Sequence, residues 1–291
     1  MTASAQQLDL SITTCIRSAL ASGALQPIAT EQLTIEDQGI PFVVRWVPAL
    51  ARKRLKTVAD SGRRPDYNPF LPHDPALEVS ALGPAHVALL NKFPVMDRHL
   101  LVITREYAPQ TAPLTGSDFA ALWSIITRLG GMGFCNGGRD AGASQHHKHL
   151  QWIPARPDDA TSVPVAVALA GADPRATLNP VPALPFGHAF CRFDDDLENA
   201  GADAGSLLHA CFSRLCADLG IDSEDNPLPP YNLLLTRRWM LVVRRSRESW
   251  QRMSINSLGY AGLLFVPEQS QLEVVTQTGP LNILKAVTAP R

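Results

Sequence analysis

The sequence predicts an α+β fold that combines antiparallel β-hairpins with amphipathic helices, and two patterns support this prediction. First, short apolar segments come in pairs joined by short turns, which is typical of hairpins. Second, three longer segments carry apolar residues at helical spacing. The predicted hairpins pair residues 33–35 with 40–44, 86–95 with 98–106, and 231–236 with 239–243. The predicted helices are residues 4–20, 117–129 and 207–219.

The composition is that of an ordinary globular enzyme. Of 291 residues, 45% are apolar and 18% are charged, and no apolar run approaches the roughly 20 residues of a membrane-spanning helix. The formal net charge of −1 argues against a broad nucleic-acid surface. Five cysteines without a Cys-x-x-Cys pair indicate neither a disulfide framework nor a cysteine zinc site. The N-terminal residues lack the basic start and apolar segment of a secretory signal, so we expect a cytoplasmic protein.

The remaining elements follow in order along the chain. Residues 37–39 supply the turn of the first hairpin, and residues 67–72 interrupt regular structure before the next strand. Ser117 is expected to cap the second helix, after which residues 132–136 form a strand. Residues 154–185 are rich in Pro, Ala, Asp and Val, so we interpret them as an excursion or linker between two halves. A short helix near residues 281–284 ends the predicted order.

One stretch carries the chemistry, namely residues 142–152, with the sequence Gly-Ala-Ser-Gln-His-His-Lys-His-Leu-Gln-Trp. Read as a strand, it places His147, His149 and Gln151 on one face. Two such histidines can bind one metal ion, or one imidazole can attack phosphorus while its neighbours hold the phosphate oxygens. The small residues of the preceding turn, 136–144, favour phosphorus chemistry because their N–H groups approach an anion without obstruction. A strand whose histidines only satisfy local hydrogen bonds is the alternative.

The same run resembles the histidine-triad superfamily, and within it the branch with glutamine in place of the third histidine, His-x-His-x-Gln. That branch contains galactose-1-phosphate uridylyltransferase and the ATP adenylyltransferases, also called diadenosine tetraphosphate phosphorylases. Residues 136–151 are similar to the adenylyltransferases specifically, and further motifs between residues 41 and 262 match that family in the same order. The resemblance implies a histidine-triad-like antiparallel sheet with packed helices, arranged as two related halves in one chain.

The resemblance also implies roles for individual residues. Residues 1–190 are expected to form the N-terminal catalytic region, and residues 191–291 a C-terminal region that completes the nucleotide site. His149 is the expected nucleophile, with His147 and Gln151 orienting the phosphate. The expected substrate contacts are Lys53, Asn91, Lys92, Asn136, Gly142, Ala143, Ser144, Gln145, Gln151, Asn232, Thr236 and Asn256.

Some of these positions have a simpler interpretation. The basic cluster that contains Lys53, Arg54 and Lys56 is either a solvated face or a polyphosphate contact, and the resemblance does not align one position with the family's lysine. Lys92 would look the same if it only faced solvent. Asn256 would also suit a helix cap.

The implied reaction is the reversible phosphorolysis of diadenosine tetraphosphate by inorganic phosphate to ATP and ADP, through an adenylyl-histidine intermediate. An imidazole attacks only when it is unprotonated, so we expect a backbone carbonyl near the glycine turn to fix the tautomer of His149. Gln151 can donate a hydrogen bond but cannot shuttle a proton, which favours transfer over hydrolysis. A divalent cation, Mg²⁺, is expected to accompany the polyphosphate without a dedicated protein site. We expect no nucleic-acid or membrane partner, and a monomer.

Three other functions stay open. A hexose-1-phosphate nucleotidylyltransferase shares the His-x-His-x-Gln strand, but that group places proline where this chain has Lys148. A nucleotide-binding module that has lost catalysis would keep the same turn. A zinc-dependent sensor could add His86 and His99 to the histidines of the strand.

Overall fold

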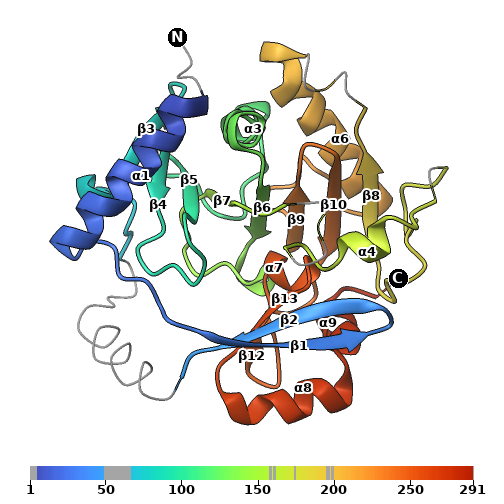
Figure 1. Ribbon diagram of the computed structural model, residues 1–291. Helices are drawn as coiled ribbons and strands as arrows, with labels where there is room; N and C mark the ends of the chain where they lie inside the picture. Colours follow the sequence, from blue (N-terminus) through green and yellow to red (C-terminus); the bar gives the residue numbers. More distant parts are fainter. Residues whose placement is uncertain are drawn as a thin grey trace.

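The computed structural model describes residues 5–48, 67–156, 159, 162–173, 175–194, 197 and 200–290. Its centre is an eight-stranded sheet in which every neighbouring pair is antiparallel (Figure 1). In spatial order the strands are β3 (Glu78–Leu82), β4 (His86–Leu90), β5 (Leu100–Thr104), β7 (His149–Ile153), β6 (Met132–Gly137), β9 (Tyr231–Leu235), β10 (Trp239–Arg244) and β8 (Ala189–Arg192). The predicted α+β class with an antiparallel sheet is confirmed.

Three helices cover one face of this sheet, α1 (Ala5–Ser22), α3 (Gly116–Leu129) and α6 (Ala204–Asp218). Each turns an apolar stripe inward, because residues three and four apart share a helix face. Helices α3 and α6 approach closely at Gly205, where an added Cβ would lie 2.4 Å from the carbonyl oxygen of Gly116. The predicted cap at Ser117 is wrong. Thr115 caps α3 in a capping box with Asp118, because α3 begins at Gly116.

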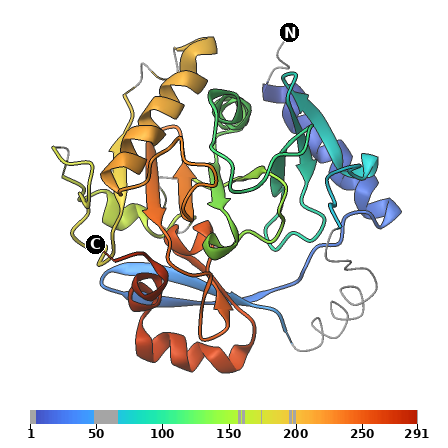
Figure 2. The same ribbon diagram turned by 180° about the vertical axis from the view of Figure 1, so that it is seen from behind.

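A second unit covers part of the other face (Figure 2). It contains a three-stranded sheet in which β2 (Ile40–Trp46) pairs with β1 (Glu31–Asp37) and with β13 (Leu263–Val266). The short helices and strands of this unit are β11 (Ser249–Trp250), β12 (Met253–Ser254), α7 (Ser257–Tyr260), α8 (Leu272–Thr278) and α9 (Pro280–Val287). Its core packs on β6, β9 and β10, whereas β4 and β5 carry a separate small cluster. On this face of the sheet, β7 therefore lies at the border of the second unit.

The order of the predicted elements largely agrees with the structure. The first hairpin turns at Gln38 and Gly39, both with positive φ, as a two-residue turn requires. Residues 154–185 are more than a linker, because α4 (Ala166–Leu169) and neighbouring apolar side chains are buried against the second unit. Leu207, an apolar residue of the predicted helix 207–219, is 51% exposed, since it lies on the outer side of α6.

Both sheets contain strands from before and after residue 190, so the two predicted regions share their core. Four single-turn 3₁₀ segments complete the described structure: Pro75–Leu77, Arg139–Ala141, Gly201–Asp203 and Gln269–Gln271. Among the described residues, no helix has both the length and the apolar character needed to cross a membrane.

Candidate active site

The site lies at the start of β7, on the face of the central sheet opposite helices α1, α3 and α6. In β7, Leu150 and Trp152 pack into the core under the helices, so His149 and Gln151 point to the other face. Strand β5 flanks them on one side, pairing Ile103 with His149, and β6 flanks them on the other. The strand begins at His149, later than predicted, and His147 precedes it in a single bridge to Pro109.

His149 has the geometry of a poised nucleophile. Its ring Nδ1 lies 2.8 Å from the carbonyl oxygen of His147, so Nδ1 carries the proton and donates it. The other nitrogen, Nε2, has no hydrogen-bond partner among the described residues and keeps its lone pair. Burial lowers the pKa of His149 to about 4, so the ring is neutral at pH 7. The carbonyl expected near the glycine turn is that of His147.

A buried amide fixes the backbone at this point. Gln110 accepts from the backbone N–H of His149 at 2.8 Å through Oε1, and its Nε2 donates to the carbonyl oxygens of Asn136 and His149 at 2.8 and 3.1 Å. Gln110 thus ties the start of β7 to the end of β6. Nothing in the sequence pattern distinguished this glutamine from a surface residue.

His147 supports its neighbour, and both of its ring nitrogens are engaged by the protein. Asn68 accepts from the backbone N–H of Phe70, so its amide nitrogen faces His147 Nδ1, 3.0 Å away, and donates to it. The Nε2–H of His147 then points to the carbonyl and hydroxyl oxygens of Thr104, at 3.0 and 2.8 Å. A direct contact between this ring and the phosphate, as the sequence predicts, would require one of these bonds to break.

The glycine-rich turn differs from the expected anion cradle. Two of its amides are used internally, because Gly142 N–H donates to the carbonyl of Arg139 and Ala143 N–H to that of Gly138. A phosphate contact through these two N–H groups would require those internal bonds to break, and it stays a prediction. The N–H groups of Ser144 and Gln145 have no acceptor among the described residues and stay candidates. Gly142 has a φ of +87°, and a Cβ there would lie 2.6 Å from the carbonyl oxygen of Ile255, so glycine is required for packing.

Two predicted contact residues instead form a buried polar network. Asn136 Oδ1 accepts from Asn232 Nδ2 at 3.0 Å and from the N–H and hydroxyl of Ser257 at 2.9 and 2.7 Å. Arg245, which is 2% exposed, donates to Asn232 Oδ1 and to the carbonyl of Ile255. This network joins the glycine turn to the second unit, and a direct contact of Asn136 or Asn232 with nucleotide stays a prediction.

The other predicted contacts lie at the ends of elements. Thr236 is fully buried, where its hydroxyl accepts from the N–H groups of Arg238 and Trp239 in the turn between β9 and β10. Asn256 caps α7, because its Oδ1 accepts from the N–H of Leu258 at 3.0 Å. Asn91 and Lys92 follow β4, where Lys92 is exposed and Asn91 contacts His99. Lys53, Arg54 and Lys56 lie outside the described residues.

The two histidines considered as metal ligands are engaged elsewhere. His86 lies 2.8 Å from Asp118, on the helix side of the sheet. His99 contacts Asn91 and Gln151. The described residues contain no group of three or more His, Cys, Asp or Glu side chains arranged to hold a metal ion.

An antiparallel sheet that presents a neutral, tautomer-fixed histidine within His-x-His-x-Gln defines a nucleotide-transferring protein of the histidine-triad superfamily. The comparisons with known proteins specify it further. A family model for the Ap4A phosphorylase N-terminal domain matches residues 1–171, and one for the ATP adenylyltransferase C-terminal domain matches residues 182–290. The chain belongs to the Ap4A phosphorylase family.

Two Saccharomyces cerevisiae proteins are similar over most of their length. Protein APA1 is 28% identical over 287 residues, which cover 90% of this chain and 87% of that protein. Diadenosine 5′,5‴-P1,P4-tetraphosphate phosphorylase 2 is 31% identical over 265 residues, covering 81% and 79%. The crystal structure of yeast Ap4A phosphorylase Apa2 in complex with AMP superposes with a TM-score of 0.77 at 25% identity, covering 100% of this chain and 98% of that one.

Proposed function

We propose that this chain phosphorolyses diadenosine tetraphosphate, using inorganic phosphate to yield ATP and ADP, in a reversible reaction. The single observation that carries the proposal is that His149 Nδ1 is hydrogen-bonded while its Nε2 has no partner in the described ranges of the chain. Family membership supports the same activity, since the similar yeast protein is named a diadenosine tetraphosphate phosphorylase.

The proposed reaction has two displacements. His149 Nε2 attacks the α-phosphorus of one adenylate, and ATP leaves. Inorganic phosphate then attacks the same phosphorus, breaks the phosphorus–nitrogen bond and gives ADP. Two displacements retain configuration at phosphorus and produce ping-pong kinetics. The proposed donors to phosphate oxygens are the N–H groups of Ser144 and Gln145, the amide of Gln151, and Lys92. Donors held in place before the reaction stabilise the charge that develops in the transition state.

Mg²⁺ belongs to the proposal as a companion of the polyphosphate. The described residues offer no cluster of protein ligands for it, so its ligands would be phosphate oxygens and water. Titration of Mg²⁺ and EDTA against the rate measures its contribution.

The test is to incubate the purified protein with diadenosine tetraphosphate, with and without inorganic phosphate, and to separate the nucleotides. ATP and ADP that form only with phosphate establish the activity. AMP and ATP without phosphate would mean hydrolysis. Turnover of UDP-glucose, with the tetraphosphate left intact, would instead indicate a hexose-1-phosphate nucleotidylyltransferase. If neither compound is turned over, the protein is a silent binding module.

We also propose that the protein is a cytoplasmic monomer. The odd number of cysteines and the lack of a Cys-x-x-Cys pair in the sequence support a reducing compartment. Cell fractionation and light scattering test the two statements separately.

A further inference from the structure

We call the face of the central sheet opposite α1, α3 and α6 the open face. On this face, a chain of three hydrogen-bonded side chains ends at the glutamine of the motif. His99 lies just before β5, with Nε2 2.9 Å from Gln151 Oε1 and Nδ1 3.1 Å from Asn91 Nδ2. The ring is 6% exposed and packs 5.8 Å from the ring of Phe134, centroid to centroid. His99 therefore occupies a fixed position beside Gln151.

The direction of each bond follows from one backbone group. The N–H of Phe93 donates to Asn91 Oδ1 at 3.3 Å, so the amide nitrogen of Asn91 faces His99 and donates to Nδ1. A neutral imidazole carries one proton, which must then lie on Nε2, where it is donated to Gln151 Oε1. Burial lowers the pKa of His99 to about 4, which keeps this neutral form at pH 7.

The consequence lies in the amide of Gln151. Its oxygen is occupied, and its NH₂ group has no acceptor among the described residues on the face shared with His149. A rotated amide would present oxygen instead, which repels phosphate oxygens. We propose, on the basis of the proposed function, that His99 is a positioning residue that holds the Gln151 amide with its N–H groups toward the transferred phosphate.

The first test compares two substitutions of the same ring. His99→Phe keeps the shape but removes the donor, so kcat for phosphorolysis should fall roughly 10-fold to 100-fold with little change in KM. His99→Gln restores an N–H donor and should recover most of the rate. In a Gln151→Ala background, His99→Phe should have no further effect, because the two residues act through one bond.

A second test uses the pH profile of Asn91→Asp. The new carboxylate can accept a proton from Nδ1, so a neutral His99 would lose the donor at Nε2, and the Gln151 amide would rotate. The protonated ring keeps both donors. This variant should gain an alkaline fall in kcat that the wild-type enzyme lacks.

The outcomes separate this inference from the proposed function. Wild-type protein without phosphorolysis would overturn the proposed function itself. Active wild-type protein with an unchanged His99→Phe variant would overturn only the role of His99. Full additivity of His99→Phe and Gln151→Ala would do the same, since it would show that His99 acts independently of the glutamine.

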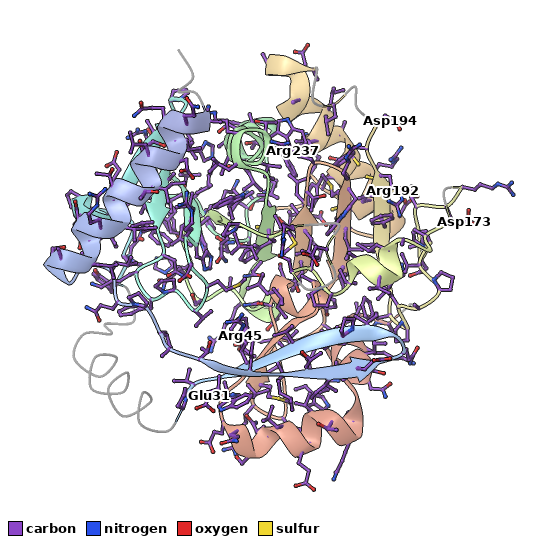
Figure 3. All side chains as sticks on the ribbon, in the orientation of Figure 1. Glu31, Arg45, Asp173, Arg192, Asp194 and Arg237 are labelled. Atoms are coloured by element: carbon purple, nitrogen blue, oxygen red, sulfur yellow. The ribbon has the colours of Figure 1, made fainter. Side chains whose placement is uncertain are left out.

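A second observation concerns two thiols at the β8 edge of the central sheet, four strands from β7. Cys191 in β8 and Cys211 in α6 have their Sγ atoms 2.7 Å apart. A hollow of about 280 Å³ lies over them, lined by Arg192, Asp194 and Arg214 among others. Figure 3 places Arg192 and Asp194 at this edge of the sheet, beside α6. A small oxidant can therefore reach the pair.

The two thiols are not equivalent. Cys211 and Arg214 lie three residues apart on the same face of α6. The hydrogen bond from Cys191 and the charge of Arg214 lower the pKa of Cys211, whereas the pKa of Cys191 is raised by the same hydrogen bond and by burial. Burial raises the pKa of Cys135 and of Cys216 to about 12, which makes these thiols poor nucleophiles.

We infer that Cys191 and Cys211 form a reversible, peroxide-sensitive dithiol. The thiolate of Cys211 attacks hydrogen peroxide, releases hydroxide and becomes a sulfenic acid. The thiol of Cys191 then attacks that sulfur, forming the disulfide and releasing water. The disulfide would join β8 to α6.

The test is peptide mapping of the protein treated with hydrogen peroxide. A cross-linked 191–211 peptide that dithiothreitol releases supports the dithiol, and Cys191→Ser should leave a sulfenic acid on residue 211 that dimedone traps. Cys216→Ser is the matched control on the same helix and should still form the cross-link. Mapping that finds both thiols reduced, while peroxide oxidises other cysteines, would overturn the inference.

Discussion

The two sides of β7 carry histidine networks of opposite character. Toward the helices, Lys148 Nζ lies 3.1 Å from Asp118, which also contacts His86 at 2.8 Å, and all three side chains are buried. Toward the open face, His99 joins the neutral amides of Asn91 and Gln151. Charges paired with one another stabilise the strand, whereas the neutral chain ends in the Gln151 N–H groups, which have no acceptor within the described part of the protein. The difference shows which side is prepared for an anionic substrate.

The largest expected effect belongs to the open face. His149→Ala removes the nucleophile and should lower kcat at least about 10⁴-fold, with the fold retained. The exposed neighbour His146 supplies the control, since His146→Ala should keep near-normal turnover. Nucleotide separation measures the turnover of both variants. Near-normal turnover of His149→Ala would refute the assignment of His149 as the nucleophile.

The helix side should respond in stability rather than in catalysis. Asp118→Ala leaves Lys148 buried without its partner and should cost roughly 3–5 kcal/mol of unfolding free energy. The exposed pair Asp9–Arg98 is the contrast, where Asp9→Ala should cost less than about 1 kcal/mol. Denaturant unfolding measures both, and equal losses would contradict the assigned difference between buried and exposed pairs.

The pH dependence of stability sharpens the comparison. Burial lowers the pKa of His149 and His99 from 6.5 to about 4, so the unfolded chain binds more protons between these values. Their contribution is complete above about pH 6.5 and should be lost as the pH falls toward 4. Burial opposes ionisation of Asp118, but bonding to His86 and the charge of Lys148 lower its pKa to about 2, so its contribution is lost only below about pH 3.8.

Unfolding curves between pH 7 and 2 measure both windows. A double variant that replaces His99 and His149 should lose most of the upper window and keep the lower one, because burial also lowers the pKa of the remaining His147. A stability that stays constant from pH 7 to 4 would contradict the neutral open-face network.

The smallest expected effect lies where the second unit meets the glycine turn. Asn256→Ala removes the cap of α7 and should cost about 1 kcal/mol of unfolding free energy, with KM for diadenosine tetraphosphate unchanged. Asn256→Ser keeps a capping oxygen and should restore stability. A raised KM with normal stability in Asn256→Ala would instead indicate that Asn256 contacts the substrate.

Much of the fold and the identity of the motif could be predicted from sequence, because both depend on local pattern. The hairpin at Gln38 and Gly39 and the helices α1, α3 and α6 follow from turn chemistry and apolar spacing. Strand β13 was missed, because its pairing with β2 joins distant parts of the chain. The alternation of side chains along a strand was enough to place His149 and Gln151 on one face.

The tertiary structure decided what each polar group can still do. Hydrogen bonding is exclusive, so a side chain that satisfies another part of the fold has less to offer a substrate. Gln110 and Asn68 take part in the site only because distant segments meet there, whereas Asn136 and Asn232 are used to hold the two units together. The sequence alone thus determined the reacting residue types and their spacing. The tautomer of His149 depends on a local group, the carbonyl of His147 two residues earlier. Only the folded chain determined the direction of the Gln151 amide, because its partner His99 is distant in the sequence.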